Sequence, residues 1–224
     1  KDSEGHITGG PSYYITYGLG SKSLATIFSV LIIIALGFIG NMVQANSIST
    51  AFNSAFEIPT QVTGLFIILL AGFIFIGGIK RIAGFAEKMV PLMAGVYVLG
   101  AIYIMICFAG DNLPTFKEIF VGAFNPSAAT GGVIGASVKE AIRYGVAAII
   151  GLFIDTFIVL TATALVILVT GSLDGTKTGI ELTQAAFVKG MGTAGSGFVA
   201  LCLFFAAFTT IIGWYFFAVQ NVKY

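Results

Sequence analysis

The stretch GFIGNMVQANSISTAFN, from Gly37 to Asn53, decides the fold, because it places polar side chains inside a long segment without charge. The uncharged segment runs from Ser23 to Phe56, which exceeds the roughly 20 mostly apolar residues that a membrane-spanning helix needs. Lipid offers no hydrogen-bond partner, so buried amide and hydroxyl groups must find protein, water or a ligand. The stretch therefore predicts a membrane helix whose polar side chains face something other than lipid.

The composition extends this prediction to the whole chain. The sequence is 57% hydrophobic and 9% charged with a mean hydropathy of +0.99, whereas an ordinary soluble domain is roughly 25% charged. Its apolar runs are continuous rather than alternating, which favours helices over a membrane β-barrel. The net charge of +1 leaves no basic surface that would bind nucleic acid, so we expect no nucleic-acid partner. The expected partner of the apolar surface is membrane lipid. We predict an all-α membrane protein that crosses the bilayer several times.

The expected order of elements follows from charge and from helix breakers. A polar segment, Lys1–Lys22, with a turn at GGP, precedes a first span that begins near Leu24. A connection broken at Pro59 follows, and the basic residues between Lys80 and Lys88 predict a cytoplasmic loop, with the Glu57 and Asp111 sides external. A short amphipathic helix is expected around Glu181–Lys189. The later spans are expected at Val62–Ile79, Met89–Gly110, Ala148–Thr170 and Phe198–Val219.

Two features in the middle of the chain are unusual. The segment AFNPSAATGGVIGASVKEAIRYG is long enough to cross the membrane but is interrupted by Gly and Pro and is half polar. Such a pattern predicts a discontinuous helix at a transport site, and the alternative is a surface loop with one amphipathic helix. The chain then enters the next span with no turn, so we expect that a connecting segment between about Gly145 and Ile149 is absent from this sequence.

Several polar residues within the spans are candidates for a binding site. Asn41, Gln44 and Ser47 would form one stripe of the first span, and a second stripe would hold Asn46, Ser49, Thr50 and Asn53. Polar stripes can bind a ligand in a water-lined cavity or hold a neighbouring helix. Asp155 is an intramembrane carboxylate that either serves transport or faces cytoplasmic water.

The stretch FTTIIGWYFF carries two adjacent hydroxyls, Thr209 and Thr210, with Trp214 one turn beyond Thr210. Hydroxyl oxygens together with carbonyls from a broken helix are suitable ligands for sodium, a hard cation. The alternative is that each threonine bonds a carbonyl one turn back on its own helix. Gly213 is expected to clear space for a close neighbour.

Catalysis finds no support in the sequence. No H-E-x-x-H or G-x-S-x-G motif is present, and the single histidine, His6, lies in the polar N-terminal segment. The two cysteines, Cys107 and Cys202, both lie inside apolar runs and are expected to be free thiols. We therefore expect no enzyme activity.

Motifs along nearly the whole chain resemble, in order, those of the alanine/glycine:cation symporter family of bacteria and archaea. They are GHITGGPSYYITYGLG, GFIGNMVQANSI, AATGGVIGASVKEAIRYGVA, FIDTFIVLTATALVILVTG and FTTIIGWYFF. The resemblance implies the inverted-repeat fold of the neurotransmitter:sodium symporters. It also implies that residues 1–224 form one partial transporter domain, covering about the third to eighth core helices, with the sixth cut short and helices missing at both ends.

By the same resemblance the protein would be a secondary active transporter in the plasma membrane. It would carry alanine or glycine together with sodium by alternating access, with sodium as coupling ion and no other cofactor. Gln44 and Trp214 would contact the substrate, and Thr209 and Thr210 would bind sodium with carbonyls of a helix outside this sequence. An ion channel or pore subunit is the alternative, because polar stripes alone would also suit a pore.

Overall fold

The computed structural model describes residues 9–110, 114, 115, 117 and 153–224, apart from the side chains of residues 79, 80, 154 and 155. Every regular element among these residues is a helix, which confirms the predicted all-α class. The chain divides into two compact units, one of Lys1–Leu92 with Leu203–Tyr224 and one of Met93–Cys202. Two long helices, α5 (Gly78–Cys107) and α11 (Ala194–Val222), contribute residues to both units.

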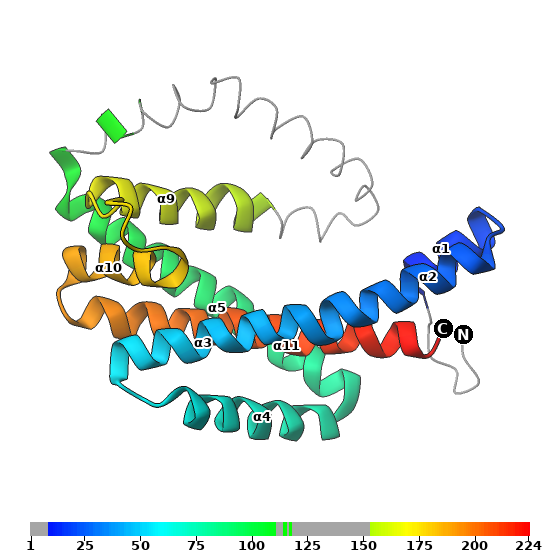
Figure 1. Ribbon diagram of the computed structural model, residues 1–224. Coiled ribbons are helices and arrows are strands. Elements are labelled where there is room, and N and C mark those ends of the chain that lie inside the picture. Colours follow the sequence, from blue (N-terminus) through cyan, green and yellow to red (C-terminus); the bar gives the residue numbers. More distant parts are fainter. Residues whose placement is uncertain (1–8, 111–113, 116, 118–152) are drawn as a thin grey trace. The chain divides into compact units, whose positions relative to one another are not determined.

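The first unit is built on one long helix that begins at Lys22 and ends at Phe56 (Figure 1). It consists of α2 (Lys22–Ile32), a π-helical segment η1 (Ile33–Gly40) and α3 (Asn41–Phe56). The Ser21 hydroxyl caps its start by accepting from the Leu24 N–H at 3.3 Å. The left-handed conformation of Glu57, with φ 56°, ends it. The first predicted span is thus confirmed.

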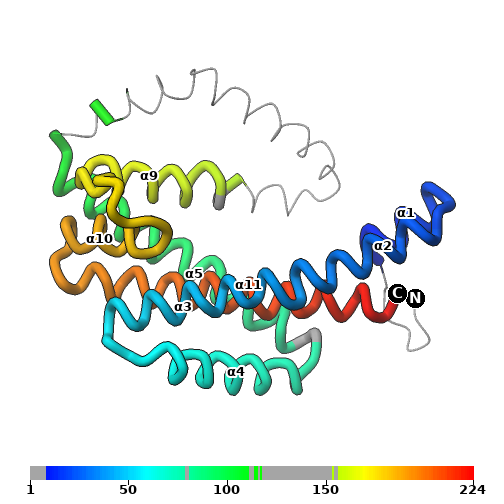
Figure 2. Tube along the Cα trace, in the orientation of Figure 1, coloured from blue at the N-terminus to red at the C-terminus, as the bar shows by residue number. Residues whose placement is uncertain are grey.

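The helix α4 (Thr60–Ile76) folds back along α3 after the expected break at Pro59 (Figure 2). The core of the unit is apolar and combines α3, α4, the start of α5 and the C-terminal part of α11. Its buried members are Ile48, Ile67, Ala71, Ile74, Ile82, Phe204, Ala207, Phe208, Ile211 and Ile212. The rings of Phe75 and Tyr215 stack at 3.8 Å between α4 and α11. α11 is therefore packed on two helices at once within this unit.

The helix α1 (Pro11–Gly18) was not predicted, because GGP by itself indicates only a turn. Pro11 occupies the first helical position, where a missing N–H costs nothing and a fixed φ favours the helix. The buried Ser12 hydroxyl lies 2.7 Å from the Ser29 hydroxyl of α2 and donates to Asn221 Oδ1 of α11, also at 2.7 Å. Side-chain hydrogen bonds thus join α1 to both α2 and the C-terminal end of α11.

The expected cytoplasmic loop from Lys80 to Lys88 is helical instead. α5 begins at Gly78 and continues to Cys107, so the basic residues occupy its first turns rather than a loop. Gly78 has φ 68°, a left-handed value that glycine adopts without strain, and α4 and α5 are joined there by a short turn. Arg81 folds back over the end of α4, where its Nη1 donates to the Phe73 carbonyl at 2.9 Å.

The second unit holds the π-helical η2 (Ile154–Val159), α9 (Leu160–Val169) and α10 (Gly179–Met191), with parts of α5 and α11. The amphipathic helix expected around Glu181–Lys189 is confirmed as α10. Its Lys189 ammonium donates to the carbonyls of Thr170 and Gly171 at the end of α9. The buried members of the apolar core are Ala101, Ile104, Ala162, Val166, Ala186, Phe187 and Val199.

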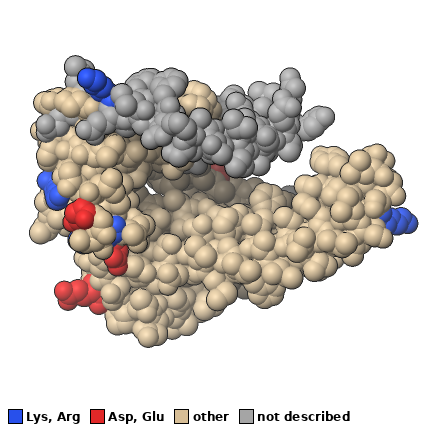
Figure 3. Space-filling view, turned by 45° about the horizontal axis from the view of Figure 1, so that its top comes forward, with Lys and Arg blue, Asp and Glu red and all other residues tan. Residues whose placement is uncertain are grey.

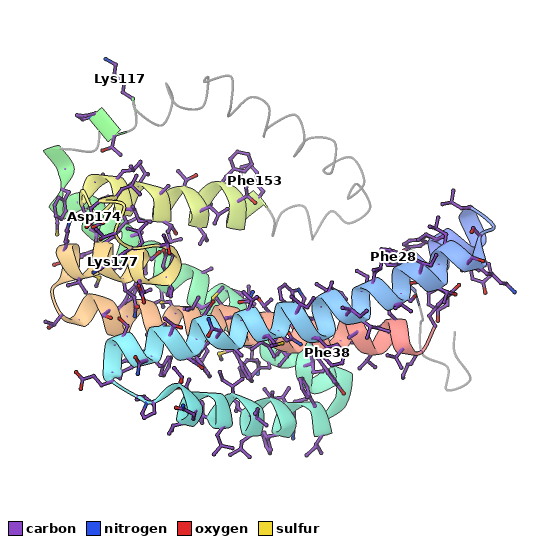
Figure 4. All side chains as sticks on the ribbon, viewed as in Figure 1. Phe28, Phe38, Lys117, Phe153, Asp174 and Lys177 are labelled. Atoms are coloured by element: carbon purple, nitrogen blue, oxygen red, sulfur yellow. The ribbon has the colours of Figure 1, made fainter. Side chains whose placement is uncertain are left out.

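The loop between α9 and α10 contains Asp174 and Lys177 (Figure 4). The Thr176 hydroxyl and backbone N–H both donate to Asp174 Oδ1, at 2.7 and 2.9 Å. These hydrogen bonds favour the carboxylate and hold the pKa of Asp174 below its usual value. The loop therefore has a local structure of its own although residues 173–178 are exposed.

Some predictions fall outside the described residues. These are the discontinuous helix within AFNPSAATGGVIGASVKEAIRYG, the missing connection near Gly145–Ile149 and the environment of the Asp155 side chain. Cys107 and Cys202 are free thiols as expected, the first exposed and the second buried.

Three helices in the described residues are long and apolar enough to cross a membrane, namely Lys22–Phe56, Arg81–Cys107 and Ala194–Val222. Most of the described surface visible in Figure 3 carries neither basic nor acidic side chains. Large apolar side chains are exposed along the long helix, and Phe38, labelled in Figure 4, is 64% exposed. Such a surface suits lipid rather than water.

Candidate functional site

The predicted site residues lie on the helix pair formed by α11 and the long helix, within the first unit. A Cβ on Gly37 would lie 3.2 Å from Ala218 Cβ, Gly40 contacts Trp214, and the rings of Phe52 and Phe204 are 5.9 Å apart. Along the long helix the contacting residues advance by fifteen positions, from Gly37 to Phe52. Their contact partners on α11 go back by fourteen positions, from Ala218 to Phe204. The two helices are therefore antiparallel with a constant register over about four turns.

This register places Gln44 level with Thr210. Gln44 follows Gly40 by one turn, Thr210 precedes Trp214 by one turn, and the pairing continues to Ile48, which is buried in the core with α11. The Gln44 side chain is half-buried and has no hydrogen-bond partner among the residues that the structure describes. A half-buried amide facing another helix is expected to find a partner, and a bound ligand or water could supply it.

Trp214 rests directly on the backbone of Gly40. A Cβ built on Gly40 would lie 2.4 Å from Trp214 Cζ3 and 2.7 Å from Cε3, far closer than real atoms approach. The indole is half-buried and leaves part of its surface accessible. Among the described residues nothing lies within 4 Å of a Cβ built on Gly213, so the expectation that this glycine clears space for a neighbour stays a prediction. The glycine that admits a close neighbour is Gly40.

The hydroxyls of Thr209 and Thr210 both bond carbonyls of their own helix. Thr209 Oγ1 donates to the carbonyls of Phe205 and Ala206 at 2.9 and 2.8 Å, and Thr210 Oγ1 donates to that of Ala206 at 3.0 Å. This arrangement is the predicted alternative to sodium binding. The bonds use the hydroxyl protons, however, and leave lone pairs on both oxygens that could still coordinate a cation. The sodium role of the two threonines stays a prediction.

Carboxylates, thiols and imidazoles do not gather into a metal site in the described residues. A cation held there would need hydroxyl, amide or carbonyl oxygens, which are the ligands that a hard monovalent ion accepts. One such oxygen is Asn41 Oδ1, which is buried without a hydrogen-bond partner, while Nδ2 of the same amide donates weakly to the Gly37 carbonyl at 3.4 Å. Asn41 directly follows Gly40, so an unused acceptor lies beside the Trp214 contact.

The two predicted polar stripes differ in the structure. In the first, Ser47 donates to the Val43 carbonyl at 3.0 Å and is thus satisfied within its own helix. In the second, Ser49 is buried while Asn46 and Asn53 are exposed. The half-buried amides of the first stripe, Asn41 and Gln44, lie on the part of the long helix next to Gly40 and Trp214, which makes this stripe the candidate site.

Sequence reasoning missed Gly40, although a signal was present. Gly37 and Gly40 lie one turn apart in GFIGN, and small residues at a helix interface allow membrane helices to approach closely. The signal did not reveal which side chain fills the space, because Trp214 lies 174 positions further along the chain.

Comparison with known proteins identifies the family of this chain. The family model described as the sodium:alanine symporter family matches residues 1–147 and again residues 135–224. The chain belongs to the sodium:alanine symporter family. This confirms the resemblance found in the motifs, and the apolar helices agree with a membrane protein of a transporter family.

Curated relatives agree with the family. The chain is 33% identical over 251 residues to the amino-acid carrier protein AlsT of Bacillus subtilis, covering 100% of this chain and 54% of AlsT. It is 34% identical over 235 residues to the sodium/proton-dependent alanine carrier protein of Bacillus sp. PS3, covering 86% of this chain and 53% of the relative. It is 30% identical over 259 residues to the uncharacterized transporter YaaJ of Escherichia coli. The chain spans about half the length of these relatives.

Proposed function

We propose that the protein transports a small neutral amino acid, alanine or glycine, across the plasma membrane together with sodium. The observation that carries the proposal is the helix pair described above, which brings Gln44, Thr210 and Trp214 within about one helical turn of one another along α11. These are three of the four residues for which the motif resemblance implies substrate or sodium binding. Membership of the sodium:alanine symporter family supports the same function.

Each residue has a chemical task in the proposal. The Gln44 amide offers two donors and an acceptor to the polar end of the amino acid, and the free Asn41 Oδ1 offers another acceptor for its ammonium group. Trp214 provides a broad apolar wall that limits the size of the substrate side chain. Because this wall would leave room only for a hydrogen or a methyl group, glycine and alanine are the proposed substrates.

Sodium would bind at Thr209 and Thr210. Their hydroxyl protons are already donated to the carbonyls of their own helix, which orients the oxygen lone pairs away from those bonds. Two hydroxyl oxygens are too few for a hard cation, so carbonyl oxygens from another helix must complete the shell. In the inverted-repeat fold that we propose, a broken helix outside these 224 residues supplies them, and alternating access exposes the site to each side in turn.

The test is uptake into proteoliposomes that contain the purified protein. With an inward sodium gradient, uptake of labelled alanine should rise and saturate, and an equal choline gradient should not drive it. Trp214→Ala should admit larger neutral amino acids such as valine. A steady conductance without amino acid would instead show a channel, and uptake that follows a proton gradient regardless of sodium would show that sodium is not the coupling ion.

A further inference from the structure

The contact between Gly40 and Trp214 has a consequence for substrate size. Gly40 has φ −62° and ψ −44°, which are ordinary helical values that any residue adopts. A glycine in a helix interior costs about 1 kcal/mol relative to alanine, so the backbone by itself would favour alanine. The requirement for glycine comes from outside the helix, because two atoms of the indole lie within 2.7 Å of the position that a Cβ would take.

The surroundings of Gly40 allow little relief from such an overlap. Gly40 is the last residue of the π-helical η1, and a Cβ there would also lie 3.0 Å from the Ala35 carbonyl oxygen. Indole atoms at 2.4 and 2.7 Å form the closer overlap, and they belong to a rigid ring whose only freedom is rotation about two side-chain bonds. A methyl group at residue 40 would therefore displace the ring from the helix.

We infer that Gly40 is a positioning residue that sets the substrate size limit through Trp214. The inference rests on the proposed function, and it adds a residue that would not itself touch the amino acid. With no Cβ at residue 40, the indole can lie close against the backbone of the long helix, and the proposed substrate methyl group would occupy the space beyond the ring. Gly40→Ala moves the ring into that space, so the variant discriminates against alanine in favour of glycine.

The first experiment compares binding of alanine and glycine to the wild-type protein and to Gly40→Ala. The alanine-to-glycine affinity ratio should fall by about tenfold or more, the usual discrimination for one methylene in a tight pocket. Gly213→Ala is the matched control, since it adds the same methyl next to Trp214 in the sequence where nothing lies within 4 Å. An unchanged ratio in Gly40→Ala, or an equal fall in Gly213→Ala, overturns the inference.

The second experiment removes the outer ring of the indole. Phenylalanine lacks the ring that carries Cζ3 and Cε3, so Gly40→Ala should shift the ratio less in a Trp214→Phe background than in the wild-type background. The double variant also covers the case in which Gly40→Ala alone does not fold, because relief of the overlap should restore folding. A double variant that is as defective as Gly40→Ala shows that the ring is not the cause.

A third measurement separates this inference from the proposed function. Trp214 is the only tryptophan in the sequence, so its fluorescence emission reports the position of the ring without any transport. Emission should shift in Gly40→Ala and not in Gly213→Ala. If the wild-type protein binds no amino acid, both the proposed function and the size limit are wrong. An emission shift in Gly40→Ala would still show that Gly40 determines the position of the ring. Unchanged emission overturns the role of Gly40 even in a working transporter.

Discussion

Single residues of the long helix show which polar groups are available for a ligand. Ser47 is satisfied by the Val43 carbonyl, whereas Gln44 has no partner among the described residues and Asn41 Oδ1 is buried without one. Helical periodicity placed Asn41, Gln44 and Ser47 on one stripe, but it could not distinguish among them. That distinction needs the neighbouring helix and the local backbone, which only the fold supplies.

Replacing Gln44 should weaken substrate binding. Gln44→Ala removes the amide that faces α11, and we expect alanine binding to lose about 1–3 kcal/mol, the usual penalty for a lost partner of a buried polar group. Asn46→Ala, on an exposed position two residues later, is the control and should change affinity little. Calorimetric titration of the purified protein checks this. Equal losses of alanine affinity in both variants would show that the stripe of Asn41, Gln44 and Ser47 serves helix packing and not substrate binding.

Replacing Thr210 should act on sodium rather than on the amino acid. Thr210→Ala removes one proposed sodium ligand, so the sodium concentration for half-maximal alanine uptake should rise, with a milder effect on alanine affinity at saturating sodium. Thr210→Ser keeps the hydroxyl and should restore the sodium dependence. If Thr210→Ala leaves the sodium dependence unchanged, Thr210 only bonds the Ala206 carbonyl.

At the scale of elements, the structure adds a helix and two π-helical segments to what the sequence predicted. Pro11 begins α1, and the residues of η1 and η2 carry no composition that separates them from ordinary helix. A π-helical segment changes the faces of the residues after it, and such segments occur frequently at functional sites. Here η1 ends at Gly40, immediately before the candidate site residues.

The hydrogen bonds of Ser12 should stabilise the packing of α1. Ser12→Ala would leave the buried Ser29 hydroxyl and Asn221 Oδ1 without this partner, and we expect a loss of about 1–3 kcal/mol in the free energy of unfolding. Thr26→Ala is the matched control, because its hydroxyl is exposed and bonds only the Lys22 carbonyl. Thermal unfolding in detergent compares the two. Equal midpoints would show that the network contributes nothing to stability.

At the scale of the whole molecule, the arrangement across the membrane follows from the positions of charge. α4 has 17 residues and is about 25 Å long, so Thr60 and Arg81 lie near opposite ends of it. Both side chains are exposed and could be labelled if replaced. The basic residues remain the basis for placing the Arg81 end in the cytoplasm, although they lie in a helix and not in a loop.

Labelling should reveal this orientation. In a background without Cys107 and Cys202, a reagent that cannot cross the membrane should react from outside with Thr60→Cys and not with Arg81→Cys. Lys88→Cys is a second position expected to be protected, and permeabilised cells should label all three. The reverse pattern would overturn the predicted orientation.

The prediction of a missing connection concerns the whole chain as well. The family model matches two overlapping segments, residues 1–147 and 135–224, and the alignments with AlsT and YaaJ extend over 251 and 259 residues for a chain of 224. Trypsin cleaves after Arg143, so one tryptic peptide of the native protein should begin at Tyr144. We expect its sequence to contain additional residues between Val146 and Ile149 that the printed sequence lacks. Tandem mass spectrometry decides this, and a continuous reading through these residues would refute the prediction.

The sequence by itself determined that the protein is a helical membrane protein, where several helices begin and end, and which family it belongs to. Hydrophobicity, proline breaks and motifs are local properties that can be read along the chain, and they predicted the first span, the break at Pro59 and α10. Only the tertiary structure paired Gly40 with Trp214 and placed Gln44 level with Thr210. Contacts between residues so distant in sequence depend on how two helices pack, and helical periodicity predicts a face of a helix but not the residue opposite it.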